Sequence, residues 1–359
     1  MSRIAGIDVG GTFTDLVYID DATGEVRLAK VPTTVPNQAF GVIAALDAAL
    51  IDPTQLEAIV HGTTTTTNAM LERRTARVGL ITTRGFRDVL ELGRRTRPTP
   101  YGLKGRFTPL IERSLRLEVD ERVDAEGQVL VPLDEAQVEA AARQLLAAGA
   151  ESVVIHFLHS YIFPAHEARA AQLVRALWPN PHVTAGHAIV AEYREYERGV
   201  TAAVNASIQP VLHRYIARLQ EELAKRGFRR ELLVMQGNGG TVAASIVAEH
   251  AVNTVMSGPA SGVIAAAATA LQAGSGSGEF ANVVTYDMGG TSTDVALVLG
   301  GLPAVSSELE LEYAMPIHVP MVDVHTIGAG GGSIASIGEE GLLHVGPRSA
   351  GAMPGPICY

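Results

Sequence analysis

The chain has 359 residues, of which 47% are hydrophobic and 18% charged, so it can bury the cores of two or three domains and is not wholly disordered. Its net charge of −10 argues against binding to nucleic acid or to an anionic membrane. Its single cysteine, Cys358, excludes an intrachain disulfide and a zinc site built from several cysteine thiolates.

The targeting features of the sequence favour the cytoplasm. The first residues lack the pattern of a signal peptide. The longest apolar stretch, residues 262–271, falls far short of the about 20 residues that span a bilayer. The lone cysteine fits a reducing compartment. We therefore expect a cytoplasmic protein without nucleic-acid or membrane partners.

The first half of the chain alternates between strand and helix patterns. Apolar runs and helical spacing predict strands at 3–8, 16–20, 26–31, 58–61, 78–82 and 153–157, and helices at 37–50, 133–148 and 164–177. Residues 94–109 predict an irregular loop because Arg, Thr, Pro and Gly dominate them. Strands followed by helices are typical of an α/β fold.

The pattern weakens between residues 179 and 192, where we place a domain boundary. The expected domains are residues 1–185 and 186–359. In the second domain, the apolar periodicity predicts a long helix at 193–226 that contains Pro210, strands at 232–235 and 283–287, and a helix at 259–272.

One eight-residue motif occurs twice. The segment from Asp8 to Asp15 and the segment from Asp287 to Asp294 are identical at six of eight positions, and apolar strands flank both. Paired glycines let the backbone approach a ligand and turn N–H groups toward an anion. The sequence therefore predicts two hairpin turns, one in each domain, that face each other and bind phosphate. The alternative is a pair of ordinary β-hairpin turns.

Each residue type of the motif suggests a role. The phosphate-binding candidates are Gly10, Gly11, Thr12, Thr14, Asp15, Gly289, Gly290, Thr291 and Asp294. Asp8 and Asp287 suit a Mg²⁺ ion through its waters, because a carboxylate that touched phosphate directly would be repelled. We take the same two residues as the catalytic candidates.

A third glycine cluster contains Gly328, Gly330, Gly331 and Gly332. It predicts a contact with the nucleotide near the adenosine or the α-phosphate, and the alternative is a flexible loop. The segment from His61 to Asn68 holds five consecutive threonines, which either line a polar site or cap the helix that follows.

Two further groups of polar residues favour structural roles. His156, His159 and His166 do not have the spacing of a common zinc site. The segment 192–198 predicts mainly a solvated helix face whose ion pairs include Glu195 with Arg198 and Arg194 with Glu197.

The two Asp-x-Gly-Gly-Thr motifs and the later glycine run resemble the actin/Hsp70/sugar-kinase (ASKHA) superfamily. More narrowly, the chain resembles the hydantoinase A/5-oxoprolinase family along its whole length. The matching stretches are IAGIDVGGTFTDLV, HGTTTTTNAMLER, LHSYIFPAHE, EYREYERGVTAAVNA, MQGNGG, MSGPASGV, DMGGTSTDV, DVHTIGAGGGSIA and GPICY.

This resemblance implies two ASKHA domains around a nucleotide cleft, with ATP and Mg²⁺ as cofactors. It implies an ATP-dependent hydrolase that opens a cyclic amide such as 5-oxoproline or a hydantoin. The alternatives are a nucleotide-binding subunit of an ATP-dependent carboxylase, or a small-molecule kinase. It also marks Glu195 and Arg198 as candidates for a domain hinge or the substrate side.

Members of this family continue well beyond the segment that resembles residues 355–359. The resemblance therefore implies a C-terminally truncated second domain, and either a missing C-terminal half or a second subunit of the B type. Both put activity of the isolated chain in doubt.

Overall fold

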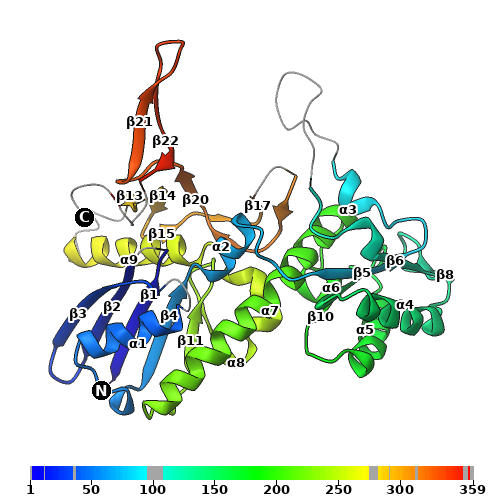
Figure 1. Ribbon diagram of the computed structural model, residues 1–359, viewed down its shortest axis with the longest axis horizontal. Coiled ribbons are helices and arrows are strands. Elements are labelled where there is room, and N and C mark those ends of the chain that lie inside the picture. The colour runs from blue at the N-terminus through cyan, green and yellow to red at the C-terminus, as the bar shows by residue number, and fades with distance from the viewer. Residues whose placement is uncertain are drawn as a thin grey trace.

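The structure is a computed structural model that describes residues 2–11, 13–34, 38–94, 108–274, 282–290, 292–311, 314–350 and 355. Figure 1 shows three groups of elements. A β-sheet with helices contains the N-terminus, a second α/β unit lies across helix α7 from it, and a smaller sheet with a projecting hairpin lies above. Most of the predicted loop at 94–109, the Gly/Ser-rich residues 275–278 and Cys358 lie outside the described residues.

The first sheet has six strands in the order β12-β11-β4-β1-β2-β3. Their bounds are β1 Arg3–Val9, β2 Phe13–Asp20, β3 Glu25–Pro32, β4 Ala58–Thr63, β11 Leu232–Met235 and β12 Thr241–Ala243. Strands β4 and β11 run parallel to β1, and the other neighbours are antiparallel. The predicted strands and the α/β class are confirmed here.

Helices cover one face of this sheet because every second residue of its central strands is apolar. Ala5, Ile7 and Val9 of β1 and Leu16 of β2 are at most 2% exposed. Helix α1 (Ala39–Ala48) packs on this face, and the long helix α7 (Glu195–Lys225) packs beside α1. Pro210 lies inside α7 without ending it, and Gly227 follows the helix with a φ of +85°.

The first sheet crosses the expected boundary at residue 185. Strands β11 and β12 come from the second half of the sequence, yet they form the edge of the sheet that β1 begins. The reason is a large insertion: the chain leaves the sheet after β4 and returns through α7. The folded unit around the first motif therefore combines residues from both sides of residue 185.

The inserted unit contains a parallel sheet in the order β10-β9-β5-β6. Its elements are α2 Thr65–Leu71, β5 Val78–Thr83, α3 Val89–Leu92, β6 Arg116–Val119, β7 Arg122–Val123, β8 Val129–Val131, α4 Glu135–Ala147, β9 Ser152–His156, α5 Ala165–Leu177, β10 Val183–Ala185 and α6 Gly186–Ile189, with a short 3₁₀ turn at Arg113–Leu115. Another 3₁₀ turn, Pro53–Gln55, precedes β4. Helices α4 and α5 lie side by side and pack against the sheet of this unit (Figure 1).

The last part of the described chain begins a second sheet. Strand β14 pairs with β13, β15 and β20, and helix α9 packs on one face. The elements are α8 Ala244–Val247, a 3₁₀ stretch Ala248–Thr254, α9 Ser257–Ala273, β13 Val283–Met288, β14 Thr293–Leu299, β15 Leu302–Pro303, β16 Val305–Ser306, β17 Leu309–Glu310, β18 Pro316–Ile317, β19 Met321–Val322, β20 Val324–Ile327, β21 Ser333–Ile337 and β22 Leu343–Ser349. The β21–β22 hairpin projects from the body (Figure 1).

No single helix in the described ranges has both the length and the apolar composition to cross a bilayer. Only Ala244–Thr254 and Ser257–Ala273 together reach that composition, and the two are bent by 95° relative to each other.

The second sheet leaves one apolar face uncovered. Val284, Tyr286, Met288, Leu297, Leu299 and Leu302 are between 45% and 73% exposed. By the shared register of the two hairpins, Tyr286 occupies the position of Ile7, which is only 2% exposed beneath the helices of the first sheet. Among the described residues, helices therefore cover this face of the first sheet, but no helix covers the equivalent face of the second sheet.

This difference predicts unequal losses of stability for two equivalent substitutions. Ile7→Ser should lower the free energy of unfolding by about 3 kcal/mol, because it leaves a cavity and buries a hydroxyl. Tyr286→Ser should change it by less than about 0.5 kcal/mol, because the ring is exposed. Urea unfolding of the 359-residue chain measures both. Equal losses would show that something covers the Tyr286 face in solution.

Candidate functional site

The two copies of the motif form hairpins with the same register. Asp8 lies opposite Asp15 in β1–β2, and Asp287 lies opposite Asp294 in β13–β14. Equivalent hydrogen bonds close the turns: Gly10 N–H donates to Phe13 O over 3.0 Å, and Gly289 N–H donates to Ser292 O over 2.9 Å. The prediction of two hairpins is confirmed. Thr12 and Thr291 lie outside the described residues.

Asp8 lies against Gly62 of the neighbouring strand β4. A Cβ atom at Gly62 would come within 2.7 Å of Asp8 Oδ1, so a larger residue there would displace the carboxylate. Asp8 is accessible to solvent, but the surrounding protein removes part of its hydration and raises its pKa. The charges of Asp15 and Asp287 raise that pKa further. The carboxylates of the two hairpins are therefore within electrostatic range of each other.

The second acidic residue of each motif is held by the next strand. Lys30 of β3 lies opposite Asp15 and pairs with it at 2.8 Å. Thr326 of β20 lies opposite Asp294 and donates a hydrogen bond of 2.6 Å to its Oδ1. Partial burial raises the pKa of Asp294 in spite of this hydrogen bond. Asp15 and Asp294 are thus anchored, whereas no hydrogen bond in the described chain holds Asp8 or Asp287.

The glycines of the first turn differ in what surrounds them. A Cβ atom at Gly10 would lie 3.2 Å from Phe13 O, so the turn itself is tight there. A Cβ atom at Gly11 would meet nothing within 4 Å among the described atoms. Gly11 therefore borders open space, which a ligand can occupy. Thr14 is fully buried, and its hydroxyl contacts the Thr33 hydroxyl at 3.1 Å.

The third glycine run packs directly on the second turn. Gly331 N–H donates to Gly289 O over 2.9 Å, and Gly332 N–H donates to Gly290 O over 2.7 Å. A Cβ atom at Gly330 would come within 2.5 Å of Gly289 O. The run therefore supports the second turn, and these two N–H groups are already engaged within the protein. Gly328 borders open space, like Gly11.

The threonine-rich segment connects the first sheet to helix α9. Thr64 donates from its hydroxyl to Val9 O over 3.2 Å, and the hydroxyls of Thr66 and Thr254 meet at 3.0 Å. Thr67 accepts from Met256 N over 3.1 Å. Thr64 at the start of α2 makes no side-chain capping bond, but Thr63 Oγ1 accepts from Thr65 N, in the first turn of α2, over 3.2 Å. The threonines also join β1, β4 and the start of α9.

His61 is a buried structural residue beside Asp8. Burial lowers its pKa to about 4, so the ring is neutral at physiological pH. Tyr215 of α7 donates to His61 Nε2 over 2.7 Å, and Nδ1 lies 3.3 Å from Ile7 O. Sequence reasoning missed Tyr215, because nothing in its own segment indicates that α7 folds back onto β4.

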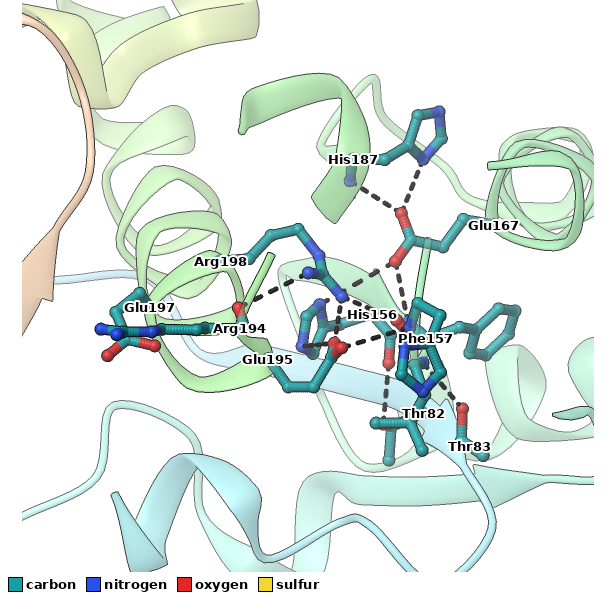
Figure 2. A network of polar contacts seen from close by, with 12 residues as sticks. Thr82, Thr83, His156, Phe157, Glu167, His187, Arg194, Glu195, Glu197 and Arg198 are labelled. Carbon is teal, nitrogen blue, oxygen red and sulfur yellow. Dashed lines mark hydrogen bonds and ion pairs between the residues drawn. The ribbon is translucent and has the colours of Figure 1, made fainter. Parts of the chain in front are cut away.

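Residues 195–198 are not the solvated face that their sequence predicts. Tyr196, Glu197 and Arg198 are all at most 8% exposed. The predicted pair of Glu195 with Arg198 is present, but Glu197 pairs with Arg94 rather than with Arg194. Figure 2 shows Glu195 and Arg198 in a polar network with His156 and Glu167, at the far end of α7 from Tyr215.

Two family models match the chain. The hydantoinase/oxoprolinase N-terminal region matches residues 4–178, and hydantoinase/oxoprolinase matches residues 198–359. The chain belongs to the hydantoinase/oxoprolinase family. Its fold is the mixed α/β architecture of ASKHA-like nucleotide-binding domains, as predicted.

Curated relatives and solved structures agree with this assignment. The chain is 38% identical to caprolactamase subunit alpha of Pseudomonas jessenii, over 99% of this chain and 51% of the relative. It is 32% identical to 5-oxoprolinase 1 of Arabidopsis thaliana, over 98% of this chain and 30% of the relative.

Two solved structures also match. The crystal structure of the ATP-dependent caprolactamase from Pseudomonas jessenii matches with a TM-score of 0.85 and 37% identity, over 99% of this chain and 52% of that one. Nucleotide-free acetone carboxylase matches with a TM-score of 0.81 and 29% identity, over 98% of this chain and 51% of that one. The chain therefore spans about half the length of several relatives that it matches.

The electrostatics of the paired hairpins predict a stability effect. Asp8→Asn should raise the unfolding temperature of the ligand-free chain at neutral pH, because a carboxylate with a raised pKa is less favourable folded than unfolded. The gain should shrink as the pH falls through the raised pKa toward the ordinary value of 3.8, where the parent also becomes neutral at this position.

Thermal unfolding between about pH 7 and pH 4 measures this difference. Asp21→Asn, an exposed position at the other end of the β1–β2 hairpin, is the control and should change little. An unfolding temperature of Asp8→Asn at or below that of the parent would contradict the account.

Proposed function

We propose that the chain is the ATP-binding part of an enzyme that hydrolyses cyclic amides. The observation that carries the proposal is the duplicated hairpin: two Gly-Gly turns in the same register, in which desolvation, the charge of Asp15 and the charge of Asp287 raise the pKa of Asp8. The names of two relatives, 5-oxoprolinase and ATP-dependent caprolactamase, support the reaction class. In this proposal Gly10, Gly11, Gly289 and Gly290 bind the phosphates, with Thr12 and Thr291.

Asp8 and Asp287 would hold Mg²⁺ through its waters. No group of three or more acidic, histidine or cysteine side chains in the described ranges is close enough to form a metal cage. The two carboxylates nevertheless fit Mg²⁺, which usually keeps several waters and is bound by one or two carboxylates together with substrate phosphates. Desolvation and then the charges of Asp15 and Asp287 raise the pKa of Asp8, and a divalent cation would offset the repulsion between these charges.

The proposed chemistry makes a poor electrophile reactive. The amide oxygen attacks the γ-phosphorus of ATP, the bond to ADP breaks, and the carbonyl oxygen carries the phosphoryl group. Water then adds to the carbon, and the ring nitrogen leaves with a proton to give an acyl phosphate. A second water releases phosphate and the open-chain carboxylate. The protein contributes positioning and charge neutralisation to the first step.

Two alternatives use the same ATP site. A carboxylase subunit would pass its activated substrate to a partner chain, and acetone carboxylase among the structural matches supports this reading. A small-molecule kinase would release a stable phosphorylated product. ADP, free phosphate and an opened ring identify the hydrolase, whereas a phosphorylated product that accumulates identifies the kinase.

The uncovered face of the second sheet supports a further part of the proposal. We propose that helices of a further segment or of a second subunit of the B type cover Tyr286 and its neighbours, as α1 covers Ile7. Relatives named as an alpha subunit and a beta subunit are parts of assemblies. We place this assembly in the cytoplasm, where ATP and Mg²⁺ are supplied.

Two substitutions at the first hairpin test the function. The readouts are ATP binding and the rate of ATP hydrolysis in the presence of 5-oxoproline, hydantoin, caprolactam or acetone. Each is measured for the chain alone and together with the protein encoded by the neighbouring gene. Gly11→Val should fold normally, because its Cβ meets nothing, but should weaken ATP binding at least about tenfold by filling the phosphate space. Asp8→Asn should keep ATP affinity and lose about 10²-fold in turnover, because the metal is misplaced.

Asp21→Asn again serves as the control. If both variants bind and hydrolyse ATP like the parent, the duplicated motif is only a pair of hairpin turns and the proposal is wrong. If none of the four compounds stimulates ATP hydrolysis by the parent, either alone or with the neighbouring protein, the hydrolase and carboxylase proposals are both wrong.

A further inference from the structure

The carboxylate of Asp8 is confined by the shape of the neighbouring strand. Asp8 lies near the end of β1, directly opposite Gly62 of the parallel strand β4 (Figure 1). Asp8 accepts no hydrogen bond from the described residues, yet a Cβ atom at Gly62 would come within 2.7 Å of its Oδ1. The carboxylate therefore occupies space that exists only because residue 62 has no side chain.

The backbone on both sides of Asp8 is tied to the segment that contains Gly62. On one side, His61 Nδ1 lies 3.3 Å from Ile7 O. On the other side, Thr64 donates to Val9 O from its N–H over 3.3 Å and from its hydroxyl over 3.2 Å. Because a carbonyl oxygen can only accept, Nδ1 of the His61 ring carries the proton and donates it.

Helix α7 holds the His61 ring in this orientation. Tyr215 donates to His61 Nε2, the nitrogen that is left as an acceptor, over 2.7 Å. The His61 side chain is fully buried and Tyr215 is only 8% exposed, so a rotated ring would leave buried polar atoms without partners. The position of β4 beside Asp8 is therefore fixed, and with it the position of Gly62.

A side chain at residue 62 would displace the carboxylate rather than the strands. The clash is with Oδ1, the far end of a side chain that can rotate, whereas the Cα atom of Asp8 would be at an ordinary 3.8 Å. The φ of Gly62 is not in the left-handed region, so alanine suits its backbone. Gly62→Ala should therefore fold with Asp8 Oδ1 moved by at least about 0.7 Å, which restores an ordinary contact of 3.4 Å.

The equivalent carboxylate of the second hairpin is less confined. Asp287 lies near Gly262 of helix α9, but a Cβ atom there would come only to 3.5 Å from Asp287 Oδ2, an ordinary contact. Among the described residues, β13 pairs with β14 alone, so no strand takes the place that β4 has beside β1. The two motifs thus share their sequence but not this contact.

We propose that Gly62 is a positioning residue for Asp8: its missing side chain fixes the place of the carboxylate and leaves both carboxylate oxygens free for the waters of Mg²⁺. Asp287, which has more room, adjusts to the metal. The part of this inference that concerns Mg²⁺ rests on the proposed function, whereas the steric contact does not. A carboxylate held by hydrogen bonds would have fewer lone pairs left to accept from metal-bound waters.

The kinetic test is ATP hydrolysis by Gly62→Ala in Mg²⁺, under the conditions that give the parent its highest rate. We expect kcat to fall at least about tenfold, because a group misplaced by about 1 Å can cost up to about 10²-fold. The KM for ATP should change less than about threefold, because the Gly-Gly turn is untouched. In the Asp8→Asn background the same substitution should lower kcat less than about twofold further, because the charge that it displaces is already absent.

Two other glycines provide matched variants. Gly6 lies on the same face of β1 as Asp8, and a Cβ atom there would be 3.9 Å from Val17 O, so Gly6→Ala is the control and should keep kcat within about twofold of the parent. Gly262→Ala should lower kcat less than about threefold, because the added methyl group makes only an ordinary contact with Asp287.

Crystal structures of the ligand-free parent and of Gly62→Ala provide a readout that needs no ATP site. Asp8 Oδ1 should move while β1 and β4 stay in place. If it moves but the parent hydrolyses no ATP, the steric contact is supported and the proposed function is wrong. An Asp8 carboxylate that keeps its position in Gly62→Ala, or a Gly62→Ala chain with the kcat of an active parent, would overturn the proposal.

Discussion

The position of Asp287 relative to Asp8 depends on the packing of helix α9 between the two sheets. One side of α9 buries Ala260, Val263 and Ala267 against Ala296 and Val298 of the second sheet. Its first turn meets the first sheet, where Ser257 donates to Thr63 O over 3.0 Å and Gly258 lies against Thr64. Small residues allow this close approach, so a hydrogen bond and a short apolar contact at the start of α9 hold the two hairpins in one arrangement.

That arrangement brings like charges together in the ligand-free chain. Lys30 compensates Asp15, and Thr326 supports Asp294, but no hydrogen bond in the described chain holds Asp8 or Asp287. Stability is thus reduced at the place where we propose that the two carboxylates act on metal-bound phosphate, a pattern that active sites commonly show. Helix α7 fixes the other side of the first sheet through Tyr215 and His61, and its far end enters the polar network around His156.

Local sequence patterns predicted the local structure well. The duplicated motif defined both hairpins, and apolar periodicity located α1, α4, α5, α7 and most strands. The sequence did not show that β11 completes the first sheet, because strand pairing across an insertion leaves no local pattern. The burial of Arg198 was missed for a similar reason: its neighbours in sequence are charged, and the residues that bury it lie on other elements. The same limit applies to Tyr215, which meets β4 only through the tertiary fold.

We propose that Asp8 and Asp287 act together on one metal–phosphate group. A double-mutant cycle with Asp8→Asn, Asp287→Asn and the double variant measures this directly, with the rate of ATP hydrolysis as the readout. We predict that the double variant is scarcely worse than either single variant, which corresponds to a coupling energy above about 1 kcal/mol. Losses that simply multiply would mean that the two carboxylates act independently, and would contradict a shared site between the hairpins.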